Sequence, residues 1–119
     1  MKTEPANPIR IYLAGEYHPA VAACQEFCDT VGLCVTITPT TYVYTGGREA
    51  GVIVGLESYP RFPSTPSALR DTAIRLALHL RSALNQRNVM VVTPTESVWL
   101  PEEMNQSNMI PVDNISDHP

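Results

Sequence analysis

The sequence predicts a small α+β protein in which two helices cover one face of a four-stranded antiparallel sheet, in the ferredoxin-like order βαββαβ. Strand-like and helix-like segments alternate in this order along the 119 residues. Each predicted helix is followed by a β-branched residue and a Thr-Pro-Thr motif, at residues 38–40 and 93–95, and a second strand-like run comes next. This internal symmetry indicates two related βαβ halves.

The first half begins with residues 9–14, which are β-branched and aromatic and end at Gly15, as in a buried strand. Pro19 suits the first turn of a helix, and Gly32 suits its C-terminal cap. Between them, apolar residues recur at spacings of three and four: Val21, Cys24, Cys28 and Val31. A helix of about 13 residues is therefore expected here.

Residues 34–44 and 50–56 are rich in β-branched and aromatic residues and predict a hairpin, broken at Gly46 and Gly47. The glycine-rich run 46–51 lacks the lysine and the strand-to-helix setting of a phosphate loop. We therefore interpret it as a hairpin turn.

The second half holds the clearest helix. Thr65 or Ser64 before Pro66 is a good helix start. An apolar stripe follows: Leu69, Ala73, Leu76, Leu80 and Leu84. Residues 89–92, continued past Pro94 by residues 97–100, predict the last strand. In this topology the strand after each helix lies at a sheet edge, where Pro39 and Pro94 are tolerated.

One α+β domain is expected over residues 1–100, and a flexible tail of acidic and polar residues over 101–119. The net charge of −4 disfavours nucleic acid as a partner. No apolar run is long enough to span a membrane. Three cysteines crowded into eleven residues favour reduced thiols and a cytoplasmic protein. No metal or cofactor motif is apparent.

Four residues are candidates for binding a ligand or a partner. Arg48 at the hairpin tip is a plausible anion contact. The segment 59–63, Tyr-Pro-Arg-Phe-Pro, holds a guanidinium between two aromatic rings on a chain stiffened by two prolines. Tyr59, Arg61 and Phe62 would suit a partner surface or a stacked base. The alternative is a crossover in which Phe62 packs the second helix against the core.

The loop after the first strand offers the only acid-base candidates, Glu16 and His18. The alternative is that both are exposed loop residues. Cys24, Cys28 and His18 do not have the spacing of a zinc site, and both thiols coincide with the apolar face of the helix. They are better interpreted as core cysteines.

Residues 11–15, Ile-Tyr-Leu-Ala-Gly, resemble the opening strand of nucleoside 2-deoxyribosyltransferases, which bind nucleosides beside that strand. The short chain, the Gly-Gly-Arg-Glu hairpin, the segment 59–63 and the polar tail together resemble small accessory proteins of bacteriophages. This second resemblance implies a protein that binds and inhibits a host component.

The leading hypothesis from the sequence is a non-enzymatic interaction protein without a cofactor. It would form homo-oligomers through a sheet edge or the open sheet face. It would bind a protein partner or an anionic, nucleotide-like ligand. The alternative is a small enzyme that acts on a nucleotide-like substrate, with Glu16 and His18 as its acid-base pair.

Overall fold

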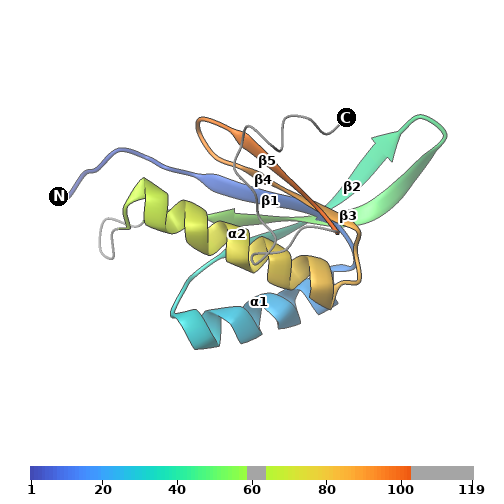
Figure 1. Ribbon diagram of the computed structural model, residues 1–119, viewed down its shortest axis with the longest axis horizontal. Helices are drawn as coiled ribbons and strands as arrows, with labels where there is room; N and C mark the ends of the chain where they lie inside the picture. Colours follow the sequence, from blue (N-terminus) through green and yellow to red (C-terminus); the bar gives the residue numbers. More distant parts are fainter. Residues whose placement is uncertain (59–63, 103–119) are drawn as a thin grey trace.

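The computed structural model describes residues 1–58 and 64–102. The elements run in the order β1 (Ile9–Ala14), α1 (Tyr17–Val31), β2 (Thr36–Tyr44), β3 (Gly47–Leu56), α2 (Pro66–Ala83), β4 (Asn88–Val92) and β5 (Ser97–Pro101). Both helices lie on one face of an antiparallel sheet (Figure 1). The predicted α+β class with two helices is confirmed.

The sheet has five strands in the order β2-β3-β1-β4-β5, so the predicted four-stranded ferredoxin-like sheet is wrong in its strand number. Residues 89–100 form a hairpin rather than one strand. The Thr93 amide donates to the Glu96 carbonyl at 2.9 Å, and this turn contains Pro94. Since β5 covers β4, the edge strands are β2 and β5, and β4 is not an edge as predicted.

The core lies between the sheet and the two helices. Strand alternation points Ile9, Ile11 and Leu13 of the central strand β1 toward the helices, and all three are buried. The other buried apolar residues come from β3 (Val52, Val54, Leu56), β4 (Val89, Val91), β5 (Leu100), α1 (Ala20, Ala23, Cys24) and α2 (Leu69, Ala73, Ile74, Leu76, Ala77, Leu80). The predicted apolar stripe of α2 is thus its packed face.

The helix boundaries agree with the capping residues in the sequence. Gly32 ends α1 in the left-handed conformation, at φ 75°. At the start of α2 the Thr65 hydroxyl accepts a hydrogen bond from the Ala68 amide at 3.1 Å, and Pro66 is the first helical residue. Helix α1 begins at Tyr17, two residues before Pro19.

The cysteines differ in their burial. Cys24 is 2% exposed, and burial raises the pKa of its thiol to about 12. Cys28 is half-buried, and burial also raises its pKa, whereas Cys34 is exposed. No group of metal-ligating side chains occurs among residues 1–58 and 64–102. The interpretation of a core cysteine therefore holds fully for Cys24 and in part for Cys28.

Some of the predicted features lie outside the described residues. They are Tyr59, Arg61, Phe62 and the tail beyond residue 102. In the described part of the chain, no helix is long and apolar enough to cross a membrane. The predicted association of copies through sheet edges stays a prediction.

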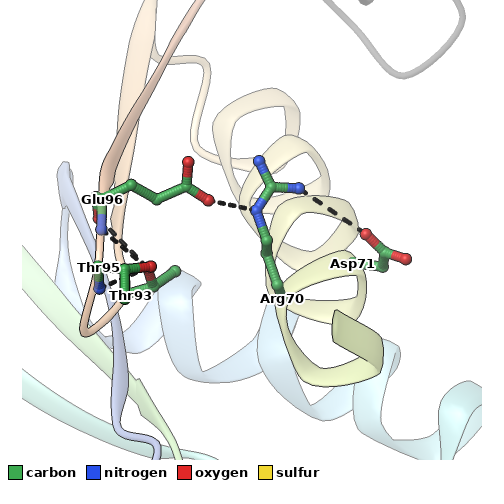
Figure 2. Close-up of polar contacts among 5 residues, drawn as sticks. All are labelled: Arg70, Asp71, Thr93, Thr95 and Glu96. Atoms are coloured by element: carbon green, nitrogen blue, oxygen red, sulfur yellow. Dashed lines mark hydrogen bonds and ion pairs between the residues drawn. The ribbon is translucent and has the colours of Figure 1, made fainter. Parts of the chain in front are cut away.

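A surface ion pair ties the β4–β5 turn to α2 (Figure 2). The guanidinium of Arg70 binds the carboxylate of Glu96, and a second nitrogen of Arg70 lies 3.9 Å from Asp71. The Thr93 hydroxyl accepts hydrogen bonds from the amides of Thr95 and Glu96, at 3.3 and 3.1 Å. These bonds shape the turn so that Glu96 faces the helix.

A double-mutant cycle measures this contact. We expect Arg70→Ala and Glu96→Ala to couple by about 0.2–1 kcal/mol in urea unfolding, because both side chains are partly exposed. The matched pair Arg70→Ala and Asp71→Ala should couple less, since its separation is longer. Equal coupling energies in the two cycles would contradict the structure.

Thiol labelling tests the burial of the cysteines. In the native protein, iodoacetamide should modify Cys34 first, Cys28 more slowly and Cys24 only after unfolding, because Cys24 is buried and protonated at neutral pH. Mass spectrometry of tryptic peptides with and without urea would show the order. Fast native labelling of Cys24 would show that its packing is wrong.

Candidate functional site

The face of the sheet opposite the helices is lined by aromatic and apolar side chains at one end. Tyr12, Met90 and Trp99 occupy paired positions on β1, β4 and β5, and alternation directs them away from the core. No helix covers this face in the described residues (Figure 1). It is therefore the surface on which a ligand has access.

A cavity of about 350 Å³ opens on this face, and we call it the sheet hollow. Its lining includes Tyr12, Tyr42, Glu49, Gln86, Met90 and Trp99. Its volume falls in the range of small-molecule sites, at the lower end. The sheet hollow can therefore hold a ligand of about nucleoside size.

Tyr42 is fixed in this hollow by two contacts. Its hydroxyl donates to the Val52 carbonyl at 3.1 Å, and its ring covers Gly51. Burial raises the pKa of Tyr42, and the nearby Tyr12 and Glu49 raise it further, whereas the Leu13 backbone acts in the opposite direction. The hydroxyl therefore stays protonated at neutral pH, and the ring forms a rigid wall.

A second cavity of about 480 Å³ adjoins the first, and we call it the helix-end hollow. Its lining includes Gly15, Glu16, Glu49, Leu84, Asn85 and Gln86. Ala14, Glu49 and Gln86 line both cavities. The two hollows therefore adjoin, and together they make one candidate site that shares Glu49.

The C-terminal turn of α2 shapes the boundary between the hollows. The Gln86 amide donates to the Arg81 carbonyl at 2.8 Å, and the Asn85 amide donates to Ser82 at 3.1 Å. Asn85 takes the left-handed conformation at φ 53°, as in a Schellman motif. The Gln86 side-chain amide donates to the Leu84 carbonyl at 3.2 Å, so its nitrogen is held by the helix end.

The charges of the site are mainly negative. Glu16 and Glu49 supply carboxylates, and the carbonyl end of α2 adds partial negative charge. Arg87 is the only basic side chain among the described lining residues. It is 82% exposed and lies 3.5 Å from the Glu102 carboxylate. The site therefore favours a cationic or neutral ligand over an anion.

The structure separates the residues predicted from the sequence. Glu16 occupies the N-cap position of α1 without a capping hydrogen bond from its side chain, and it lines the helix-end hollow. His18 is exposed and contacts the Tyr17 ring edge-on, with centroids 5.3 Å apart, and it is not part of either lining. Arg48 is exposed near the hairpin tip and also lies outside both linings.

Four of the residues that line the site are not predicted from the sequence: Tyr42, Glu49, Gln86 and Trp99. The alternation of β2 and β3 could have placed Tyr42 and Glu49 on one face, because they are register partners. Asn85 directly after the apolar stripe of α2 was a usable sign of a helix end. The meeting of Glu49 with Gln86 depends on tertiary packing and had no local sign.

No family model and no curated protein matches this sequence. Among solved structures, the chain resembles a phage SAM lyase in its apo state, with a TM-score of 0.71 and 14% identity over 84% of this chain and 92% of that one. It also resembles a phage SAM lyase in complex with S-methyl-5'-thioadenosine, with a TM-score of 0.63 and 12% identity over 89% and 97%. At these identities the likeness shows a shared fold.

A weaker likeness, with a TM-score of 0.42 and 17% identity, connects it to CutA from Synechococcus elongatus PCC7942, over 85% of this chain and 80% of that one.

These comparisons correct the leading hypothesis from the sequence. A non-enzymatic interaction protein is contradicted, because the structural neighbours over most of the chain are enzymes that act on SAM. The resemblance to phage proteins is supported, since both neighbours come from phages. A resemblance to nucleoside 2-deoxyribosyltransferases is not shown.

Gly51→Ala tests how the sheet hollow is built. A methyl group there would overlap the Tyr42 ring and would lie 2.9 Å from the Leu13 carbonyl oxygen. We expect a loss of about 1–3 kcal/mol in the free energy of unfolding, measured with urea.

The matched control is Gly47→Ala, whose methyl group has the exposed Tyr44 ring as its nearest neighbour, at 3.1 Å. The loss in the free energy of unfolding should be smaller for Gly47→Ala, because the exposed Tyr44 side chain can move aside. If the two variants were equally stable, the packing of Tyr42 on Gly51 would be refuted.

Proposed function

We propose that this protein is a small enzyme that cleaves S-adenosylmethionine (SAM) and releases S-methyl-5'-thioadenosine. The observation that carries the proposal is the Glu49 carboxylate shared by two adjoining hollows, in a chain with the fold of phage SAM lyases along most of its length. The likeness supports this reaction class, and the charge of the site supports a cationic substrate.

The reaction balances without any added reactant. The bond between sulfur and Cγ of the methionine half breaks, and sulfur keeps the electron pair and becomes a neutral thioether. The four-carbon fragment either closes a lactone through its own carboxylate or loses a proton from Cβ to a base. Both products of the four-carbon fragment have the same elemental composition and hence the same mass, so proton NMR is needed to distinguish them.

Glu49 is placed to orient the substrate. A carboxylate that faced only the sulfonium would stabilise bound SAM, but it would lose its charged partner as the bond between sulfur and carbon breaks. Such a contact favours binding of the substrate and does not favour its cleavage. The ammonium group of the methionine half keeps its charge throughout. We therefore assign to Glu49 the binding of this ammonium group, with Glu16 beside it in the helix-end hollow.

Glu49→Gln tests the proposal. Incubation of the wild-type protein with SAM should yield S-methyl-5'-thioadenosine, detected by liquid chromatography and mass spectrometry. The variant should lose about 10²-fold in kcat/KM, because the amide keeps the shape of the side chain but not its charge.

Two control variants accompany this test. Glu57→Gln removes an exposed carboxylate outside both linings and should leave the rate unchanged. His18→Ala should keep the rate within about threefold, because His18 lies outside both hollows. A large loss in His18→Ala with none in Glu49→Gln would restore the acid-base pair Glu16 and His18 and refute our assignment.

A further inference from the structure

Trp99 is the only tryptophan of the chain, and its side chain is left 54% exposed in β5. Exposure of so large an apolar surface to water costs free energy that packing would recover. Trp99 instead lines the sheet hollow beside its register partner Met90. This exposed indole is therefore a candidate contact for a ligand that covers it.

The side chains around Trp99 form an apolar floor. Tyr12 pairs with Met90, and Met90 pairs with Trp99. The three side chains therefore form one row across β1, β4 and β5, whose neighbouring strands lie about 4.8 Å apart. The fixed ring of Tyr42 lines the same hollow. Aromatic faces and a thioether sulfur make favourable contacts with flat ring systems.

The charge around this floor restricts the ligand further. Glu49 lines both hollows, whereas Arg87 lines only the sheet hollow, is exposed and lies 3.5 Å from the Glu102 carboxylate. A phosphate group would therefore be repelled by the Glu49 carboxylate, and Arg87, which is paired with Glu102, would not offset this repulsion. A nucleoside without a phosphate group avoids this repulsion.

We propose that the sheet hollow binds the base of a purine nucleoside stacked on Trp99 and rejects the phosphorylated nucleotide. This inference rests on the proposed function for the same site. It extends that function by naming Trp99 as the side chain that binds the base, and by stating that the negative charge of the site excludes nucleotides, which we call the charge rule. A purine offers the larger flat face for stacking, and one of the neighbouring structures contains S-methyl-5'-thioadenosine.

The single tryptophan makes the test direct. Titration of the wild-type protein with S-methyl-5'-thioadenosine and with adenosine should change the tryptophan emission in a saturable way. Adenosine monophosphate should bind about tenfold more weakly than adenosine in isothermal titration calorimetry. Equal or tighter binding of the monophosphate would overturn the charge rule.

Variants at Trp99 assign the contact. Trp99→Ala should weaken binding of S-methyl-5'-thioadenosine about tenfold or more by calorimetry, whereas Trp99→Phe should keep most of the affinity because it keeps an aromatic face. The matched control is Tyr44→Ala, since Tyr44 is also 54% exposed but lines neither hollow. Its affinity should be unchanged.

The outcomes separate this inference from the proposed function. If SAM is cleaved but Trp99→Ala binds S-methyl-5'-thioadenosine as tightly as wild type, stacking on Trp99 is wrong and the proposed function stands. If purine nucleosides bind through Trp99 but SAM is not cleaved, the proposed function fails and this inference stands. If the emission depends on protein concentration and not on nucleosides, the face is an interface between copies and the inference is overturned.

Discussion

The central position of β1 is the constraint on which the rest of this structure depends. β1 pairs antiparallel with β3 on one side and β4 on the other. Its alternation places Ile9, Ile11 and Leu13 in the core under the helices and Tyr12 on the open face. A slip of one residue in this register would exchange these two sets of side chains. The register of β1 therefore determines both which side chains form the core and which side chains line the sheet hollow.

The candidate site lies where several elements end. β1 ends at Ala14, Glu49 lies among the first residues of β3, and Gln86 lies in the turn that follows α2. The close approach of these ends requires Gly15, at φ 134°, because a side chain there would lie 2.5 Å from Leu84. Gly51 has the same role toward Tyr42. Loops and element ends commonly carry function on a rigid sheet, and here the sheet also supplies the aromatic wall.

Much of the fold could be predicted from local chemistry. Thr65 and Pro66 mark the start of α2, Gly32 marks the end of α1, and the β-branched run 9–14 is the strand β1. The sequence predicts one strand too few because the Thr-Pro-Thr motif gives the same local signal at residues 38–40 and at residues 93–95. In the first half Pro39 lies inside the edge strand β2, whereas in the second half Pro94 lies in a turn that Thr93 and Glu96 close. The two Thr-Pro-Thr motifs differ only in the strands with which their flanking residues pair, and this pairing is set by tertiary structure.

The sequence by itself determined the two helices, the central strand, the hairpin and the acidic balance of the chain, because caps, periodicity and charge act over a few neighbouring residues. Tertiary structure alone decided which residues form a site. Glu49, Gln86 and Trp99 come from three parts of the chain with no shared local pattern, and they line the sheet hollow only when β3, β4 and β5 pair around β1. Likewise, Glu16 and His18 are neighbours in sequence, yet helix geometry places only Glu16 in the lining of a hollow.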